Sequence, residues 1–144
     1  GHAYEHISQA KSLTTSAALQ SGRAAYAEAG LAPADIDLLQ LYDCFTPALL
    51  IQIEDLGFCD KGAGGDWLAS GISRPGGNKP LNTHGGMLSY CHPGNPGAMF
   101  GLTEAMTQMR GDAGKRQIEG VSTALCHAQG GIMSSHATVI LGVD

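Results

Sequence analysis

The spacing of apolar side chains predicts a helix and then a strand in the first third of the chain. Small and apolar residues recur at helical intervals over residues 12–30, with Ser12 as a possible cap and Gly30 as the stop. Residues 33–35 predict a turn, and the short apolar run 36–42 is typical of a buried strand. Residues 1–8 show no clear period, and we expect a loop there.

Further along, the pattern predicts two helices separated by long connections. Thr46-Pro47 favours a helix start, with proline at the first helical position, and Gly57 ends that helix. Residues 58–80 are rich in glycine and too long for a plain connection, which is typical of a functional loop. A third helix is predicted over residues 96–110, with apolar side chains on one face at Met99, Leu102, Met106 and Met109.

The last third predicts two strands, at residues 121–127 and 132–143, joined by a turn at residues 128–131. Together these elements predict one layered α/β domain over residues 1–144, with a mixed β-sheet packed between helices.

Composition and charge narrow the class of protein. A chain of 144 residues is long enough to bury a core without disulfides, and its four cysteines lack Cys-x-x-Cys spacing, which favours a reducing, cytoplasmic setting. The net charge is −5 and no basic run occurs, so we expect neither nucleic acid nor an anionic membrane as partner. No apolar run reaches the roughly 20 residues of a membrane span.

Residues 81–97 carry the densest candidate chemistry, because Tyr90, Cys91 and His92 stand between glycines and prolines that restrict the backbone. We interpret this stretch as an active-site loop. Polar side chains also follow predicted strands at residues 42–45 and 126–131. In layered α/β folds such strand ends commonly converge on a ligand crevice.

Two other kinds of site find little support. The adjacent pairs Cys91-His92 and Cys126-His127 lack the usual short ligand spacings of zinc sites, so no metal is predicted. The glycines at 62–65 lack the Gly-Lys-Ser/Thr ending of a phosphate-binding loop.

Four motifs in order resemble the C-terminal half of the thiolase superfamily, particularly the sterol-carrier-protein-type thiolases and the lipid-transfer-protein-like aldolases. The family shows His-Asp-Cys-Phe, Asn-x-x-Gly-Gly, Gly-His-Pro and a late Gly-rich turn that contains His or Cys. The corresponding stretches here are Tyr42-Asp43-Cys44-Phe45, Asn82-Thr83-His84-Gly85-Gly86, Cys91-His92-Pro93 and Cys126-His127-Ala128-Gln129-Gly130-Gly131. The likeness spans nearly the whole chain.

The departures from the thiolase motifs resemble the aldolases that cleave steroid side-chain CoA thioesters. Tyr42 replaces the histidine of the first motif, and Cys91, preceded by Tyr90, replaces the glycine of the third. The resemblance therefore implies retro-aldol cleavage of a β-hydroxyacyl-CoA, with a steroid side-chain thioester as candidate substrate.

The resemblance and the chemistry together give a set of expected site residues. The catalytic candidates are Tyr42, Tyr90, His92, Cys44 and His127; the substrate or oxyanion candidates are Asn82, Gly85, Gly86, Gly130 and Gly131. No bound cofactor is expected, since coenzyme A enters as part of the thioester substrate.

Retro-aldol cleavage needs a base for the β-hydroxyl proton, stabilisation of a thioester enolate and an acid for the enolate carbon. The pKa of a free tyrosine is near 10, so Tyr42 or Tyr90 needs neighbouring donors or positive charge to act as a base near neutral pH. His92 could donate or polarise the thioester oxygen, and a backbone N–H near Gly131 could complete an oxyanion site. We expect the two tyrosines to share proton transfer; which is base and which is acid stays open.

The resemblance also implies a longer enzyme and an assembly. The other half of the family's fold is absent, and a homodimer through the thiolase core and an OB-fold acyl-CoA-associated partner are implied. Two alternatives stay open: a thiolase or acyltransferase that uses Cys44 and His92, and a non-catalytic acyl-CoA-binding subunit. Buried packing is also an ordinary role for Cys44 and His127.

Overall fold

The computed structural model describes residues 1, 6–94 and 96–143. The expected loop at residues 1–8 therefore lies partly outside the described residues, and so does Asn95 of the active-site stretch. From residue 6 the chain forms a short 3-10 turn, η1 (Ile7–Gln9), before the main elements begin. Within the described part of the chain, no helix has the length and apolar character needed to span a membrane.

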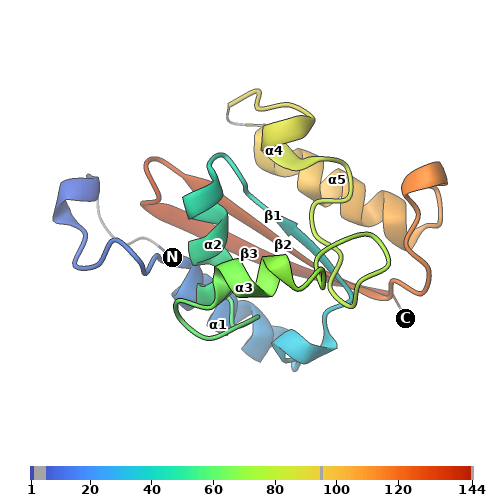
Figure 1. The fold of residues 1–144 in the computed structure, drawn as a ribbon, viewed down its shortest axis with the longest axis horizontal. Coiled ribbons are helices and arrows are strands. Elements are labelled where there is room, and N and C mark those ends of the chain that lie inside the picture. The colour runs from blue at the N-terminus through green and yellow to red at the C-terminus, as the bar shows by residue number, and fades with distance from the viewer. Residues whose placement is uncertain (2–5, 95, 144) are drawn as a thin grey trace.

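The predicted mixed sheet is present as three strands (Figure 1). They are β1 (Leu38–Leu41), β2 (Thr123–Gly130) and β3 (Ser135–Gly142), in the order β1-β2-β3. Strand β1 runs parallel to β2, with Leu39 opposite Leu125, and β2 runs antiparallel to β3. The carboxyl ends of β1 and β2 therefore lie at the same edge of the sheet.

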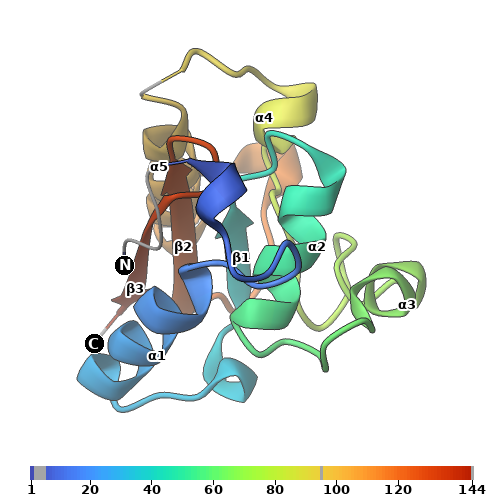
Figure 2. The same cartoon turned by 90° about the vertical axis from the view of Figure 1, so that its left-hand side faces the viewer.

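Helices cover both faces of this sheet, as predicted (Figure 2). On one face, α1 (Ala18–Ala29) and α2 (Thr46–Asp55) enclose the larger core, and α3 (Gly64–Ala69) packs beside α2. On the other lies α5 (Gly97–Met109), with the short α4 (Gly86–Ser89) beside it. The larger core consists of Ala18, Ile36, Leu39, Leu41, Leu49, Ile53, Leu56 and Leu125; the smaller one consists of Leu38, Ala105, Ala124 and Cys126.

Alternation along the strands explains these two cores. Leu39 and Leu41 point to the α1 and α2 face, whereas Leu38 points to α5, because successive strand residues face opposite sides of a sheet. All four residues of β1 are buried, which is why its sequence is a continuous apolar run with one glutamine.

The first helix starts later than predicted. Ser12 does not cap it: the Ser12 hydroxyl accepts a hydrogen bond from the Thr14 N–H in a local turn. The N–H and hydroxyl of Ser16 then both donate to Asp55 Oδ2, at 2.7 and 2.8 Å, which holds this segment against α2. Helix α1 therefore begins at Ala18. Its predicted end at Gly30 is confirmed, with φ +67° at that glycine.

The predicted apolar face of the third helix is only half right. Leu102 and Met109 pack toward the sheet, but Met99 and Met106 are 58% and 43% exposed. The buried face instead uses small residues: Ala105 is buried, and Gly101 faces the side chain of Gln40 so closely that a Cβ would lie 3.2 Å from it. Small side chains on this face let α5 approach β1 and β2 closely, so large apolar side chains are not needed there.

Three local features differ from the prediction. Residues 58–80 contain α3 and residues 81–97 contain α4, both too short for a clear helical period. Residues 128–130 belong to β2, so the hairpin turn lies at residues 131–134 instead of 128–131. Leu81 also forms a parallel bridge with Leu39 at the outer edge of β1.

Candidate active site

Asp43 joins the first motif to the second. Its buried carboxylate accepts a 2.6 Å hydrogen bond from the Met87 N–H at the start of α4. Gly86 lies against this carboxylate with φ +65°, and a Cβ there would be 2.6 Å from Asp43 Cγ. Only glycine fits both the backbone conformation and the space, so the Gly-Gly pair serves to bring α4 onto the end of β1.

Asn82 holds the same segment to the strand. Its side-chain amide donates to the Leu41 carbonyl at 2.9 Å and accepts from the Leu41 N–H at 2.8 Å. Asn82 has φ +49°, a left-handed conformation that asparagine tolerates better than most residues. Its amide is thus engaged with the strand backbone, and Asn82, Gly85 and Gly86 do not line the main cleft described next.

A cleft of about 480 Å³ opens where the first, third and fourth motifs meet. Five of the expected site residues line it: Tyr42, Cys44, His92, Gly130 and Gly131. In Figure 2 the segment after β1, the loop between α4 and α5, and the β2–β3 turn lie at the same end of the sheet. The structure thus brings these five residues together, four of them at the ends of β1 and β2 and His92 on the loop between α4 and α5.

Tyr42 and His92 are in direct contact in this cleft. The Tyr42 hydroxyl lies 3.1 Å from His92 Nε2, and their rings meet edge to face at 5.5 Å between centroids. Burial raises the pKa of Tyr42, and a charge on Cys44 would raise it further. Tyr42 is therefore a neutral phenol near pH 7, and His92 Nε2, when unprotonated, is the acceptor for its proton.

Cys44 is held by Gln129, which is itself held by Gln52, and neither glutamine was among the expected site residues. Gln129 Nε2 donates to Cys44 Sγ at 3.0 Å, and Gln129 Oε1 accepts from Gln52 Nε2 at 3.3 Å. Gln52 is fully buried and also donates to the Tyr42 carbonyl at 2.8 Å. A glutamine between Leu49 and Ile53 on a buried helix face is the sequence signal that could have pointed to it.

The environment keeps Cys44 as a thiol. Burial, the largest effect, raises its pKa, the hydrogen bond from Gln129 lowers it in part, and the nearby Asp43 charge adds to the rise. A neutral thiol beside a neutral phenol suits donation of a proton better than nucleophilic attack.

Tyr90 lies away from this cleft. Its side chain is 59% exposed and lines a separate cavity of about 310 Å³, with His84, Phe100, Thr103, Glu104, Thr107 and Arg116. The Tyr90 ring contacts those of His84 and Phe100 edge to face, at 5.6 and 5.7 Å between centroids. The structure thus separates the two tyrosines, because α4 turns the chain between Gly86 and Tyr90.

His84 is an unusual member of this second cavity. Among the described residues, none hydrogen-bonds either of its ring nitrogens, although both atoms are buried. Burial lowers the pKa of His84, so its ring is neutral near pH 7.

His127 also lies outside the main cleft. It is 4% exposed and points to the α1 side of the sheet, where Nδ1 lies 2.8 Å from Thr138 Oγ1 and Nε2 lies 3.0 Å from His136 Nδ1. Burial lowers the pKa of His127 to about 3, and a charge on His136 would lower it further. The adjacent Gly130 and Gly131, not the imidazole, reach the cleft.

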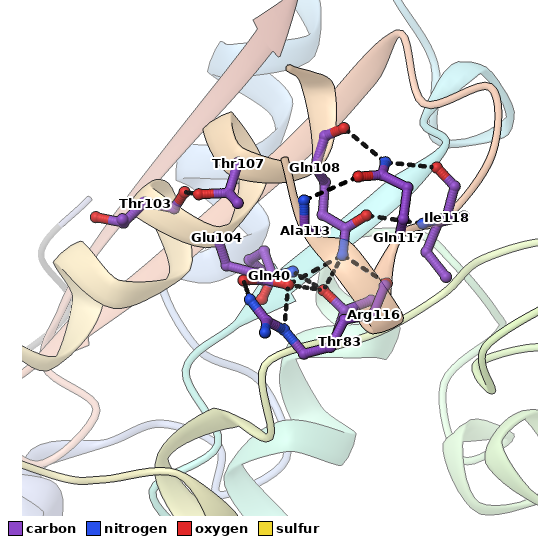
Figure 3. Close-up of polar contacts among 10 residues, drawn as sticks. All are labelled: Gln40, Thr83, Thr103, Glu104, Thr107, Gln108, Ala113, Arg116, Gln117 and Ile118. Atoms are coloured by element: carbon purple, nitrogen blue, oxygen red, sulfur yellow. Dashed lines mark hydrogen bonds and ion pairs between the residues drawn. The ribbon is translucent and has the colours of Figure 1, made fainter. Parts of the chain in front are cut away.

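A buried polar network fixes the second motif to α5 (Figure 3). Thr83 donates to Glu104 Oε1 at 2.8 Å and accepts from Gln40 Nε2 at 3.1 Å, while Arg116 pairs with Glu104 at 2.9 Å. Burial alone would raise the pKa of Glu104, but hydrogen bonds from Arg116, Gln108 and Thr83 outweigh it and lower the pKa. Glu104 is therefore an anchor held as a carboxylate.

Among the described residues, no group of three or more His, Cys, Asp and Glu side chains is placed to hold a metal ion. The acid–base groups at the cleft are instead a phenol, an imidazole and a thiol. Fold and cleft together define an α/β domain whose acid–base side chains lie after β1 and on the loop between α4 and α5, at the carboxyl end of two parallel strands.

Comparison with known proteins identifies this arrangement. The model of the thiolase C-terminal domain-like family matches residues 1–143, and the chain belongs to that family. It is 43% identical over 116 residues to the 17-hydroxy-3-oxo-4-pregnene-20-carboxyl-CoA lyase of Mycobacterium tuberculosis, which covers 79% of this chain and 28% of that protein. It is 39% identical over 115 residues to an acetyl-CoA acetyltransferase of Methanothermobacter thermautotrophicus, covering 80% of this chain and 30% of that protein.

Aldolases appear among both the similar sequences and the similar solved structures. The steroid side-chain-cleaving aldolase of Thermomonospora curvata is 42% identical over 125 residues, covering 85% of this chain and 30% of that protein. The solved Ltp2-ChsH2(DUF35) aldolase superposes with a TM-score of 0.84 at 36% identity, covering 94% of this chain and 34% of the matched chain. The chain thus spans about a third or less of the length of these relatives.

Proposed function

We propose that this chain is the C-terminal catalytic part of an aldolase that cleaves a β-hydroxyacyl-CoA by a retro-aldol reaction, with a steroid side-chain thioester as substrate. The observation that carries the proposal is the Tyr42–His92 contact of 3.1 Å inside the cleft. The names of the two steroid-cleaving relatives support the substrate class.

The reaction assigns a task to each group at the cleft. A base takes the proton of the β-hydroxyl, the Cα–Cβ bond breaks, and its electron pair passes into the thioester enolate as the carbonyl product leaves. An acid then protonates the enolate carbon and gives the shortened acyl-CoA. In this proposal Tyr42 relays the hydroxyl proton to His92, and Cys44, a thiol that accepts a hydrogen bond from Gln129, is the acid.

The enolate oxygen needs a hydrogen-bond donor. Among the described residues, none accepts a hydrogen bond from the N–H of Gly131, which lines the cleft at the start of the β2–β3 turn. This N–H is the proposed oxyanion donor, with Gly130 beside it.

Tyr90 is the second proposed acid–base tyrosine, and its position on a separate cavity makes its role testable against that of Tyr42. If the substrate spans both cavities in the complete enzyme, both tyrosines are needed for turnover. Asn82, Gly85 and Gly86 are proposed to hold the loop that carries these groups.

The assembly is part of the proposal. A homodimer and an OB-fold partner protein are expected, and the matched aldolase structure is named for a complex of Ltp2 with ChsH2(DUF35). Coenzyme A is proposed only as part of the substrate.

A thiolase or acyltransferase that uses Cys44 and His92 is the second candidate. Both residues line the cleft, and an acetyl-CoA acetyltransferase is among the relatives. The raised pKa of Cys44 favours the aldolase, because a nucleophile is needed as the thiolate. Tight binding of a CoA ester without turnover would instead indicate a non-catalytic subunit.

Mass-resolved product analysis of the complete enzyme, with any partner, tests the proposal. The enzyme is given a steroid β-hydroxyacyl-CoA without free coenzyme A. A ketone or aldehyde and a shortened acyl-CoA are expected. Turnover of a β-ketoacyl-CoA only when free coenzyme A is added would establish thiolysis instead.

A further inference from the structure

The β2–β3 turn at residues 131–134 carries Gly131 into the cleft wall. It carries two left-handed residues, Gly131 with φ +61° and Met133 with φ +56°. A left-handed conformation is unfavourable for methionine, so other contacts must hold the turn in this shape. Ser134 supplies one, because its N–H donates to the Gly130 carbonyl at 3.2 Å.

His136 supplies the second contact. This contact determines which nitrogen carries the proton in His136 and, through a series of hydrogen bonds, in His127. His136 Nε2 lies 3.0 Å from the Met133 carbonyl, which can only accept, so Nε2 carries a proton. In a neutral ring, Nδ1 of His136 is then an acceptor. The group it faces at 3.0 Å, Nε2 of His127, must therefore be the donor.

The same reasoning fixes which group donates in the hydrogen bonds between His127 and α1. With its proton on Nε2, His127 accepts at Nδ1 from the hydroxyl of Thr138, 2.8 Å away. The Thr138 oxygen lies 2.8 Å from the Ser21 hydroxyl of α1, which is then the donor, in preference to its longer 3.3 Å contact with the Ala18 carbonyl. Both imidazoles are 4% exposed, and burial disfavours a charged ring. The neutral arrangement gives one donor and one acceptor to each of the three contacts that the two rings make, with Met133, with each other and with Thr138.

We propose that His136 is a positioning residue for the cleft: its neutral Nε2–H tautomer holds the Met133 carbonyl and thereby the turn that presents the Gly131 N–H. His127, in the same tautomer, orients His136 and acts through it, without touching substrate. The catalytic consequence rests on the proposed function, whereas the tautomers and the turn do not.

The first test needs no variant. Nitrogen-15 NMR of the histidine rings in the natural full-length protein, at pH 7, reports the tautomer of each ring. Both His127 and His136 are expected to carry a proton on Nε2 and none on Nδ1. A proton on Nδ1 of either ring would overturn the proposal.

A matched pair of variants tests the positioning role. In His136→Gln the side-chain amide reaches as far as Nε2 and can still donate to Met133, whereas in His136→Asn the shorter amide reaches only as far as Nδ1. We expect amide hydrogen exchange in the turn to be about tenfold faster in H136N than in H136Q, which corresponds to one lost hydrogen bond. Exchange in α5 should be the same in both.

Turnover in the complete enzyme separates this proposal from the proposed function. A fall in kcat of at least about tenfold in H136N, with recovery in H136Q, is expected from a displaced oxyanion donor. Equal exchange in the two variants, or equal kcat in an enzyme that does perform the aldol cleavage, would overturn the positioning role. If the wild-type enzyme lacks aldolase activity, the proposed function fails and the NMR and exchange results still decide the rest.

Discussion

Tyr42 and His92 lie 50 positions apart in the chain, yet the Tyr42 hydroxyl meets His92 Nε2 at 3.1 Å. The contact depends on residues that do not touch it. Asp43 holds the start of α4, and Asn82 holds the preceding segment to Leu41, so the loop that carries His92 returns over the end of β1. The chemistry at the cleft is therefore set by hydrogen bonds beneath it.

Replacing Tyr42 with phenylalanine should remove the proton path to His92 while leaving the ring in place. We expect kcat/KM of the complete enzyme to fall on the order of 10²–10⁴-fold, the usual contribution of a positioned acid–base group. Steady-state assays of the aldol cleavage measure it. Tyr26→Phe is the matched control, since the Tyr26 hydroxyl donates to the Leu56 carbonyl far from the cleft, and it should keep full activity.

The Tyr90→Phe variant, assayed together with Tyr42→Phe, tests whether the second cavity takes part in the aldol cleavage. An effect as large as that of Y42F would mean that the substrate reaches both cavities. Full activity in Y90F would restrict proton transfer to the main cleft, and full activity in Y42F would contradict the mechanism.

The hydrogen bond from Gln129 to Cys44 should be visible in the reactivity of the thiol. The donor favours the thiolate, so Gln129→Leu should raise the pKa of Cys44 and slow its alkylation by iodoacetamide about two- to tenfold at pH 8. Peptide mass spectrometry resolves each cysteine. Cys59, whose neighbours do not include Gln129, is the internal control and should keep its rate. Faster alkylation of Cys44 in the variant would show that exposure, not the hydrogen bond, governs it.

Gly86→Ala should destabilise the fold by about 2–4 kcal/mol, because the methyl group meets the buried Asp43 carboxylate and the backbone is left-handed. Urea unfolding monitored by circular dichroism measures the change. Gly65→Ala is the control: it lies in α3 with open space around it, and alanine there should be neutral or stabilising by about 0.5–1 kcal/mol. Equal stability of G86A and the wild type would contradict the tight fit at Asp43.

Local patterns in the sequence carried enough information for the sheet and the principal helices. The apolar run at β1, the proline near the start of α2 and the glycine after α1 each have a physical cause that acts over a few residues. The start of α1 could not be found this way, because Ser16 bonds to Asp55 across 39 positions. Long-range polar contacts override the local preference.

For the candidate site, too, the sequence predicted some residues correctly and misplaced others. Motif order brought Tyr42, Cys44, His92, Gly130 and Gly131 into the prediction, and they line one cleft. Proximity in sequence was misleading for Tyr90, since only Cys91 separates it from His92 but α4 and the following turn direct it to another cavity. It was misleading again for His127, because the alternation along β2 sends its ring to the face opposite α5.

The buried histidines should lower the free energy of unfolding as the pH falls, starting at pH values well above those at which carboxylates titrate. Burial lowers the pKa of His127 to about 3 and also lowers those of His136 and His84, whereas each is near 6.5 in the unfolded chain. The unfolded state thus binds protons that the native state does not, so this stability is complete above pH 6.5 and is lost as the pH falls, for His127 down to about pH 3. Between pH 6 and 5 the free energy of unfolding should drop by up to about 1.4 kcal/mol per pH unit through His127, and His136 and His84 should add to the drop in the same direction. Urea titrations at fixed pH values measure this slope. In His127→Gln/His136→Gln the slope should flatten and leave mainly the part due to His84; an unchanged slope would show that the pair is already charged in the native protein.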